Sequence, residues 1–238
     1  MRKNNTANRR ILPGVALLLI AALVTSGPAT AAKKQDPPET TTDGLKLVKK
    51  TKSRVVYKAD GAEFDKYTKV MIVECAVAFK ENWQRDYNRE VIDLSGKVRD
   101  SDVTRMKNKL SAEFKKVFTE VMTKSNHEVV TEAAADVLIL RPAIINLVVN
   151  APDLRTTGMT RTYVADSGQM TLYLELYDSV SSAKLAVIMD AEDAGRVAPT
   201  MGMSNRVTNI RDADMILKKW ATELAGHLGA ATTASTDN

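Results

Sequence analysis

The chain has 238 residues, of which 44% are hydrophobic and 26% are charged, and its formal net charge is +5. It contains one cysteine, Cys75, which excludes an intramolecular disulfide. Stability must therefore come from an apolar core.

The amino terminus has the order of a secretory signal peptide. Four bases and no acid lie in the first ten residues, and fourteen mostly apolar residues follow at positions 11–24. The small residues Ala29 and Ala31 predict cleavage before Ala32. An uncleaved anchor would need about 20 apolar residues, but a Ser-Gly-Pro run interrupts this segment at 26–28.

The same segment predicts the final location of the chain. No cysteine lies beside the cleavage site, so we expect no lipid anchor there. Arg9 and Arg10 leave the twin-arginine route open beside the general secretory route. The mature chain is predicted to be soluble in the periplasm or secreted, with no membrane span after cleavage.

Cleavage changes the charge balance. It removes four bases and no acid, which leaves 30 lysines and arginines against 29 acids, a net charge of +1. A protein that binds nucleic acid needs a surplus of cations to neutralise phosphates. We therefore expect no nucleic-acid partner.

Composition divides the chain into four parts. Residues 1–31 form the predicted signal peptide, and the polar residues 32–43, with two prolines and three consecutive threonines, are typical of a flexible linker. Residues 44–230 have the length of a single domain. Residues 231–238 are predicted to be a disordered tail.

The first elements of the domain are predicted to be strands. Short β-rich stretches lie at 45–48 and 54–58, and residues 70–79 form the first long apolar run. Such a run is typical of a central strand covered on at least one side. Alternation along one continuous strand places Cys75 on an apolar face, where we expect a buried and inert thiol. The other members of that face are Met71, Val73, Val77 and Phe79.

A long amphipathic helix is predicted next. Asp100 or Ser101 can cap it by accepting from the free backbone amides of its first turn. Apolar residues then recur every three or four positions, with lysines elsewhere. The apolar positions are Val103, Met106, Leu110, Phe114, Val117 and Val121.

The following segments predict a long strand and a hairpin. Residues 135–150 are β-rich, but Pro142 lacks a backbone donor, so we expect this strand to bend there or to lie at a sheet edge. Residues 169–178 alternate between apolar and polar side chains, and residues 185–190 return as a partner strand. The apolar face of the first hairpin strand is Met170, Leu172, Leu174 and Leu176.

The last element is a second amphipathic helix. It is predicted to begin near Thr208 or Asn209, and Gly229 is expected to end it. Its apolar positions are Ile210, Ala213, Ile216 or Leu217, Trp220, Leu224 and Leu228. The order of elements predicts an α+β fold, a two-layer sandwich in which two amphipathic helices cover one face of a mixed sheet of about four to five strands.

Several segments resemble one bacterial envelope family. These segments are DGLKLV, VYKADGAEFDKYTKVMI, VAFKENWQRDYN, ADVLILRPAI and LYLELYDSVSSAKL. They are similar to the family called domain of unknown function 3313, over about residues 43–229. Many members of that family look like lipoproteins, whereas this chain lacks a cysteine at its cleavage site. The resemblance implies an envelope location and assigns no catalytic residue.

The segment at 82–90, NWQRDYNRE, is the most specific of these pieces. Aromatic and arginine side chains dominate the binding energy of many protein interfaces. In a long loop at 80–99 they would form a partner-binding surface consisting of Trp83, Arg85, Asp86, Tyr87 and Arg89. The alternative is structural: Trp83 closes one end of the core, and Arg85 pairs with Asp86 or a carbonyl.

Two further loops are predicted at 151–168 and 191–209. Met201 and Met203, with Met159 as a third ligand, can bind copper(I), because thioethers are soft ligands. Methionines in such loops more often pack onto the core. We therefore expect no resident cofactor.

No residue pattern indicates catalysis. His127 and His227 lie in no nucleophile or metal motif. Asp190, Glu192 and Asp193 are expected to be solvated acids at a strand end rather than a carboxylate pair for glycan hydrolysis. The sequence favours a non-enzymatic protein that contacts an envelope protein, and the alternative is a carrier of a small ligand such as a lipid, a glycan or a metal.

Overall fold

The computed structural model describes residues 36–150, 168–193 and 206–232. The elements below all lie in one compact unit, Pro37–Asn238. The predicted signal peptide lies outside the described ranges, and no helix within those ranges is long and apolar enough to cross a membrane.

The elements follow one another in mixed order along the chain. The strands are β1 (Lys46–Lys50), β2 (Arg54–Lys58), β3 (Lys69–Ile72), β4 (Ala76–Phe79), β5 (Glu128–Val129), β6 (Val137–Val149), β7 (Gly168–Asp178) and β8 (Lys184–Asp193). The helices are α1 (Trp83–Glu90), the short 3-10 helix η1 (Leu94–Gly96), α2 (Asp100–Lys124) and α4 (Arg206–Thr232).

The strands form one mixed sheet of eight, in the order β1-β2-β8-β7-β6-β3-β5, with β4 also paired to β6. The pairs from β1 to β6 along this order are antiparallel, and β3 pairs in parallel with β6 and β5. The predicted α+β class and mixed sheet are confirmed. The predicted number of about four to five strands is wrong, because the short stretches before residue 60 join the sheet and the first long strand is split.

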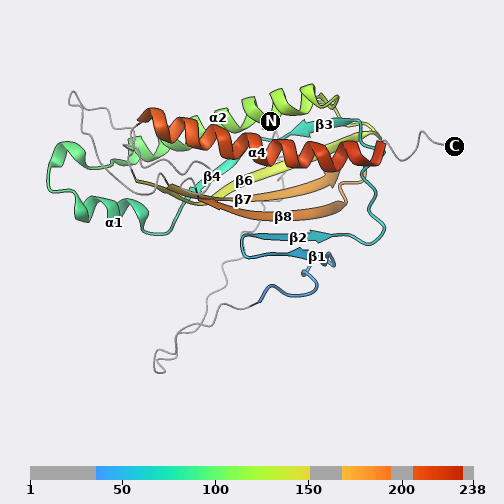
Figure 1. The fold of residues 1–238 in the computed structure, drawn as a ribbon, viewed down its shortest axis with the longest axis horizontal. Coiled ribbons are helices and arrows are strands. Elements are labelled where there is room, and N and C mark those ends of the chain that lie inside the picture. Colours follow the sequence, from blue (N-terminus) through green and yellow to red (C-terminus); the bar gives the residue numbers. More distant parts are fainter. Residues whose placement is uncertain (1–35, 151–167, 194–205, 233–238) are drawn as a thin grey trace, which may run out of the picture. The chain divides into compact units, whose positions relative to one another are not determined.

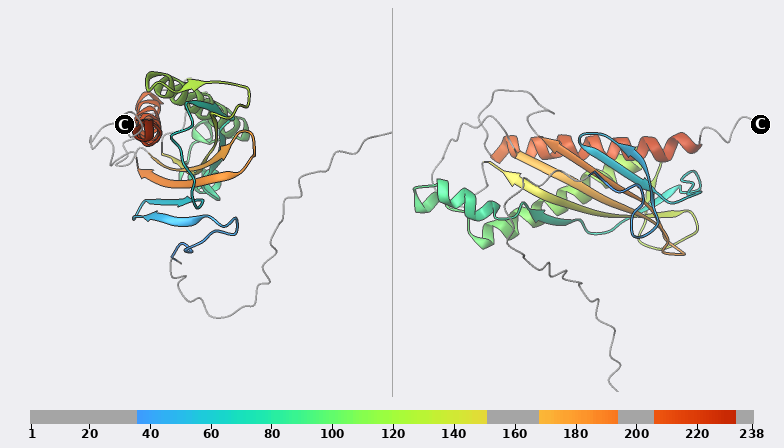
Figure 2. Two further views of the ribbon diagram at one scale, coloured as in Figure 1. Left: turned by 90° about the vertical axis from the view of Figure 1, so that its right-hand side faces the viewer. Right: turned by 90° about the horizontal axis from the view of Figure 1, so that it is seen from below.

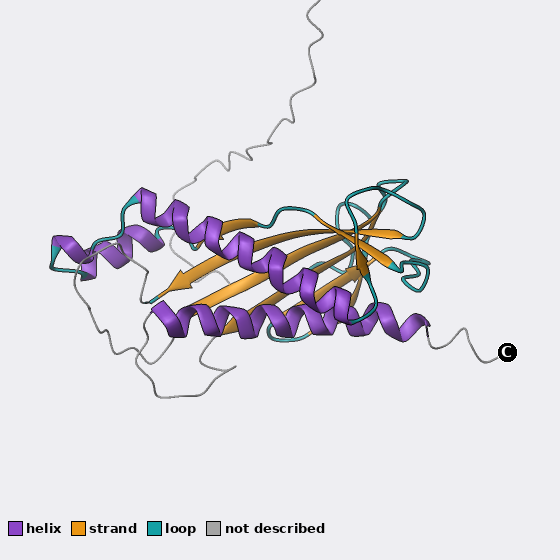
Figure 3. Ribbon diagram, turned by 90° about the horizontal axis from the view of Figure 1, so that it is seen from above, coloured by secondary structure: helices purple, strands orange, loops and turns teal. Residues whose placement is uncertain are grey.

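Two helices cover one face of the sheet. α2 and α4 contact each other and lie side by side over the strands, as Figures 1 and 3 show. The core between the layers contains the stacked rings of Phe114 and Phe118, with centroids 3.9 Å apart, and the fully buried Leu140, Leu174 and Leu217. This is the predicted arrangement of two amphipathic helices on a sheet.

The predicted strand at 70–79 is interrupted at 73–75. β3 pairs with β6 up to Leu140, and β4 resumes the pairing at Ala143. The gap lies beside Pro142, which has no backbone N–H to offer a neighbouring strand. Of the two predicted alternatives for Pro142, a bend or a sheet edge, the edge is excluded: β6 lies inside the sheet, and the strand beside it is interrupted.

The interruption also changes which side chains face the core. Val70 and Ile72 are buried in β3, and Cys75 is buried just before β4. Val73, which one continuous strand would place on the same face as Cys75, is 40% exposed. The buried thiol is confirmed, but the predicted single apolar face is wrong, because a break in a strand shifts its two-residue alternation.

α2 begins with a different cap from the one predicted. Arg99 occupies the N-cap position, so neither Asp100 nor Ser101 does. The backbone N–H of Arg99 donates to the carboxylate of Asp102 at 3.0 Å. An acid in the first turn thus satisfies a free amide and also interacts favourably with the helix dipole.

α4 is longer than predicted at both ends. It begins at Arg206 and continues past Gly229, which we expected to end it. A glycine inside a helix costs only about 1 kcal/mol relative to alanine, and two alanines follow it here. The predicted apolar stripe is confirmed where side chains are described, with Ile216, Leu217, Trp220, Leu224 and Leu228 buried.

β7 and β8 form the predicted hairpin. The four apolar side chains of the predicted face are buried under the helices. β8 continues to Asp193 rather than ending near residue 190. Asp190 therefore lies within a strand and not at its exit.

Candidate functional site

A groove of about 420 Å³ lies on the helix side of the sheet, between α4 and the strands β2 and β8. β1, β2, β7, β8 and α4 line it, together with Phe64 from the loop after β2. Figure 2 shows the β1–β2 hairpin at the margin of the sheet that lies farthest from the two helices. The hairpin thus extends the sheet beyond the cover of α4 and leaves a groove beneath it.

Strand alternation places the side chains of β2 in this groove. Arg54, Val56 and Lys58 pair with the β8 residues Asp190, Ile188 and Ala186, all of which line the groove. Tyr57, which alternates with them, belongs to a small core on the opposite face of the sheet. The groove side of β2 is therefore a row of one apolar and two cationic side chains.

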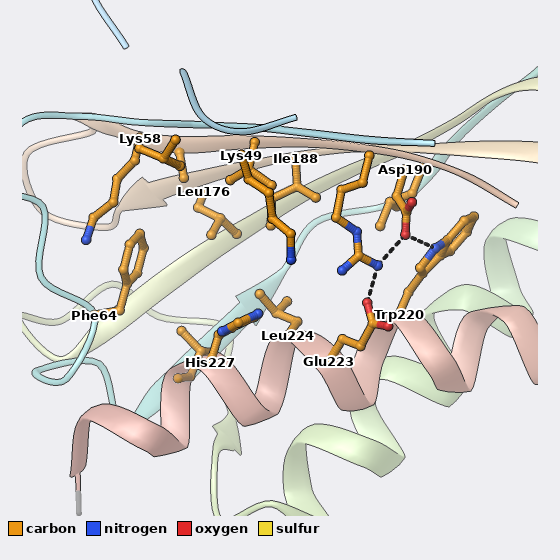
Figure 4. Close-up of a pocket in the computed structure, with 16 residues that line it drawn as sticks. Lys49, Lys58, Phe64, Leu176, Ile188, Asp190, Trp220, Glu223, Leu224 and His227 are labelled. Atoms are coloured by element: carbon orange, nitrogen blue, oxygen red, sulfur yellow. Dashed lines mark hydrogen bonds and ion pairs between the residues drawn. The ribbon is translucent and has the colours of Figure 1, made fainter. Parts of the chain in front are cut away.

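A buried ion cluster closes one end of the groove (Figure 4). Asp190 is only 1% exposed and accepts from Arg54 Nη2 at 2.5 Å and from Trp220 Nε1 at 3.0 Å. Arg54 also pairs with Glu223 of α4. Burial lowers the pKa of Arg54, but its hydrogen bonds with Asp190 and Glu223 outweigh burial and raise the pKa above its ordinary value.

This cluster connects β2 and β8 to α4. A buried carboxylate is tolerated only when it is paired and hydrogen-bonded. The expectation that Asp190 is a solvated acid is therefore wrong. Glu192 also pairs, with Lys219 of α4 at 2.6 Å, and Gln169 donates to Asp193 at 3.3 Å.

The mouth of the groove carries cations. Figure 4 shows the ammonium of Lys49 pointing towards α4, and that of Lys58 beside the ring of Phe64. Lys58 Nζ lies 5.2 Å from the centroid of that ring. His227 of α4 lines the same region. Within the described part of the chain, neither Lys49 nor Lys58 forms an ion pair.

The floor of the groove is apolar. It consists of leucine, isoleucine and alanine side chains of β7, β8 and α4, namely Leu172, Leu176, Ala186, Ile188, Leu224 and Leu228. Apolar clefts with a few placed polar groups are the usual form of small-molecule sites. An apolar floor with cations at its mouth is suited to a molecule that has an apolar body and an anionic head.

The segment predicted as a partner-binding loop contains the helix α1. Trp83 is buried, its ring stacks on Phe79 with centroids 4.3 Å apart, and its Nε1 donates to the carbonyl of Val149 at 3.2 Å. Tyr87 is half-buried, and its ring centroid lies 5.8 Å from that of Trp83. The structure thus places both predicted aromatics against the end of the sheet.

The charged residues of α1 are exposed and pair with one another. Arg85 donates to Asp86 at 3.1 Å through both Nε and Nη2, and Arg89 Nη1 lies 4.0 Å from the same carboxylate oxygen. The helix is held at its other side by Asn88, whose side chain makes two hydrogen bonds to the backbone of Val98. The five predicted residues therefore divide into two buried or half-buried aromatics and three exposed charges.

Two exposed aliphatic side chains lie just after α1. Ile92 is 99% exposed and Leu94 is 75% exposed. Both lie in the long segment at 80–99, and the sequence pattern assigned them no role. The signal that could have identified them is the absence of a helical or strand periodicity that would bury them.

The remaining predicted site residues are the three methionines and the histidines. Met159, Met201 and Met203 lie outside the described residues, and among the described residues no group of three His, Cys, Asp or Glu side chains is arranged to hold a metal. His127 is buried, and neither of its ring nitrogens has a hydrogen-bond partner within the described ranges.

The groove residues were missed because they come from distant segments. Lys49, Lys58 and His227 meet only when β1 and β2 pair beyond β8 and α4 lies across them. One signal was visible in the sequence: residues 44–59 contain six bases and no acid. Net charge of the whole chain conceals such a local excess.

Several solved structures are distantly similar to the chain, among them the following two. A PelC dodecamer from Paraburkholderia phytofirmans matches with 13% identity and a TM-score of 0.36, over 71% of this chain and 96% of that one. A neuraminyllactose-binding hemagglutinin homolog from Helicobacter pylori matches with 10% identity and a TM-score of 0.33, over 76% and 95% of the two chains. At these scores neither likeness carries a functional argument.

No curated protein matches the chain. A family model does match, over residues 41–224, which cover the sheet from β1 to β8 and most of α4. The family resemblance predicted from the sequence is thereby confirmed. The chain belongs to the family described as protein of unknown function, DUF3313.

Proposed function

We propose that this chain is a non-enzymatic envelope protein that binds an amphipathic anion in the groove between α4 and the β1–β2 hairpin. The observation that carries the proposal is an apolar groove whose mouth carries Lys49 and Lys58, two lysines that form no ion pair with the described residues. The envelope location rests on the signal-peptide pattern of the first 31 residues.

The apolar floor supports a ligand with a hydrocarbon chain. A methylene group that leaves water contributes about 0.8 kcal/mol, so a chain that reaches past Ile188 to Leu172 supplies most of the binding energy. Trp220 and the Arg54 ion cluster stand at the end of this path and limit its length. Straight alkyl chains therefore suit the groove better than bulky sugars.

The charges at the mouth select the sign of the head group. Arg54 is neutralised by Asp190 and Glu223 and has little attraction left for a ligand. Lys49 and Lys58 keep their charge available, and hydrogen bonds from an ammonium to a phosphate or carboxylate are about twice as strong as neutral ones. A phosphate or carboxylate at the head of the chain is thus favoured over a neutral or cationic group.

The test uses residues 32–238, which include every described element, and the fluorescent probe anilinonaphthalene sulfonate. We expect the probe to bind in the groove and to be displaced by dodecyl phosphate. Dodecyl maltoside and dodecyl trimethylammonium, which have the same chain, should displace it at least about tenfold less well. Equal displacement by all three, or none by dodecyl phosphate, contradicts the proposal.

Two variants distinguish binding of the head group from binding of the alkyl chain. Lys49→Ser with Lys58→Ser should weaken the binding of dodecyl phosphate about tenfold and leave the binding of dodecyl maltoside unchanged. Val56→Trp fills the groove from a half-buried position without altering the charge, so it should weaken the binding of both dodecyl ligands. Lys115→Ser with Lys109→Ser, on exposed positions of α2, is the control for net charge.

A second candidate function is docking of a protein partner through the segment at 80–99. The exposed Ile92 and Leu94 favour it, because exposed apolar patches often mark contact sites and these two large apolar residues lie only two positions apart in the chain. A photocrosslinking residue at position 92 should then capture one recurrent envelope protein. The same residue at position 180, where Val180 is 67% exposed in a hairpin turn, should not. Identical capture at both positions contradicts this function.

A further inference from the structure

The β1–β2 hairpin carries a concentrated positive charge. Residues 44–59 contain five lysines, one arginine and no acid. Lys49, Lys50 and Lys52 are exposed. The acid on one side, Asp43, pairs with Lys184 at 2.5 Å, and the acid on the other, Asp60, pairs with Lys46 at 2.5 Å. Arg54 pairs with Asp190 and Glu223, whereas Lys49, Lys52 and Lys58 form no ion pair with any residue of the described ranges.

This charge adjoins an exposed apolar residue and the groove. Val48 is 57% exposed and lies beside Lys49 in β1, and both residues line the groove. The hairpin thus forms one lip of the groove, at the margin of the sheet away from the helices (Figure 2). Basic side chains around an exposed aliphatic group are the features by which peripheral proteins bind anionic membranes.

The lysines have a simpler role that must be weighed. A lysine on an edge strand prevents pairing with the sheet of another molecule, and β1 is the edge strand here. That role requires charge only on the free edge of β1. It does not account for Lys52 in the turn, for the absence of acids from both strands, or for an exposed Val48.

We propose that the β1–β2 hairpin docks the mouth of the groove onto an anionic phospholipid surface. The inference rests on the proposed function, since such a surface supplies amphipathic anions of the class that the groove is suited to bind. The lysines approach the phosphate head groups, and Val48 enters the interface between head groups and acyl chains. The same contact brings the open end of the groove against the lipid.

The test is co-sedimentation of residues 32–238 with vesicles of phosphatidylcholine alone or mixed with phosphatidylglycerol. Binding is expected only to the mixed vesicles and should fall as salt is added. Lys50→Glu with Lys52→Glu changes two hairpin lysines that do not line the groove. Each lysine near an anionic surface contributes about fivefold to binding, so this variant should bind at least roughly 25-fold more weakly.

A matched control makes the same charge change elsewhere. Lys109→Glu with Lys115→Glu on exposed positions of α2 should weaken vesicle binding by no more than about twofold, because distant charges are screened. An equal loss in both variants overturns the inference, as does equal binding to vesicles without phosphatidylglycerol. The inference is also overturned if Lys50→Glu with Lys52→Glu loses binding to double-stranded DNA but still binds the mixed vesicles. That result would indicate a nucleic-acid surface.

The docking proposal and the groove-binding proposal can be contradicted independently of each other. Lys50→Glu with Lys52→Glu should leave probe displacement by dodecyl phosphate unchanged, whereas Val56→Trp should weaken probe binding and leave vesicle binding intact. Vesicle binding that needs the hairpin lysines supports docking even if the groove binds no probe. Probe binding without any vesicle preference supports the groove and overturns the docking.

Discussion

Asp178 ends β7 and holds the turn that follows it. Its carboxylate accepts from the backbone N–H of Ser181 at 2.8 Å, from that of Val180 at 3.1 Å, and from the hydroxyl of Tyr67 at 2.7 Å. These hydrogen bonds hold the pKa of Asp178 well below its ordinary value, and the backbone N–H of Ser181 has the largest effect. The ionised form is therefore part of the folded structure.

We expect Asp178→Asn to lower the free energy of unfolding by about 2 kcal/mol near neutral pH, because charge-assisted hydrogen bonds are lost. Since the folded pKa is lowered, the contribution of Asp178 is complete above the ordinary aspartate pKa of about 3.9 and is lost as the pH falls below it. Urea unfolding of both proteins should show a difference that is constant from about pH 7 to pH 5 and shrinks between about pH 4 and pH 2. A difference that stays constant over the whole range contradicts the account.

Cys75 is the second residue whose behaviour follows from its surroundings. Burial raises the pKa of its thiol to about 12. Because only the thiolate reacts, Ellman's reagent should leave the native chain unmodified at neutral pH and should modify it fully in urea. Stoichiometric reaction of the folded chain at the rate of the unfolded one would contradict the buried position.

At the scale of elements, α1 depends on a few anchors at the end of the sheet. Trp83 stacks on Phe79, and Asn88 bonds the backbone of Val98 before α2. α1 is eight residues long, and a helix so short is not stable alone. Its position must therefore come from these contacts.

Trp83→Ala should lower the free energy of unfolding by about 3–5 kcal/mol, because a buried indole leaves a cavity. Arg85→Ala, which removes an exposed side chain paired only with its neighbour, should change it by less than about 0.5 kcal/mol. Hydrogen exchange of α1 should be accelerated by the first change alone. Equal effects of the two substitutions would mean that Trp83 is not an anchor.

The elements also show what the sequence could predict. The two long helices and the hairpin were predicted because period and length agree over many residues. The break in the first long strand was not, since it depends on Pro142, which lies about 70 residues away in the chain and beside it in the sheet. α1 was missed because its polar sequence buries only Trp83, so no apolar stripe marks it.

At the scale of the whole compact unit, strand order decides where a ligand can bind. The burial of Cys75 was predicted correctly although the strand assumed for it is interrupted, whereas the groove needs β2 beside β8 and α4 across both. Pairing partners of short strands cannot be derived from propensity. The candidate site was therefore beyond sequence reasoning, although the acid-free segment at 44–59 was visible.

The groove contains one of the two tryptophans of the chain, which gives it a specific signal. Trp220 lines the groove, whereas Trp83 is the first residue of α1, stacks on Phe79 outside the groove and serves as an internal reference. Bromine quenches an indole only on close approach. A brominated ligand can therefore report which tryptophan it reaches.

The most direct test of the central claim is a fluorescence titration of the Trp83→Phe variant with dibrominated stearate. We predict saturable quenching of Trp220, weakened about tenfold by Lys49→Ser with Lys58→Ser. The reciprocal variant Trp220→Phe, which leaves only Trp83, should show no saturable quenching. Quenching of Trp83 equal to that of Trp220, or no quenching of either, would contradict a binding site in this groove.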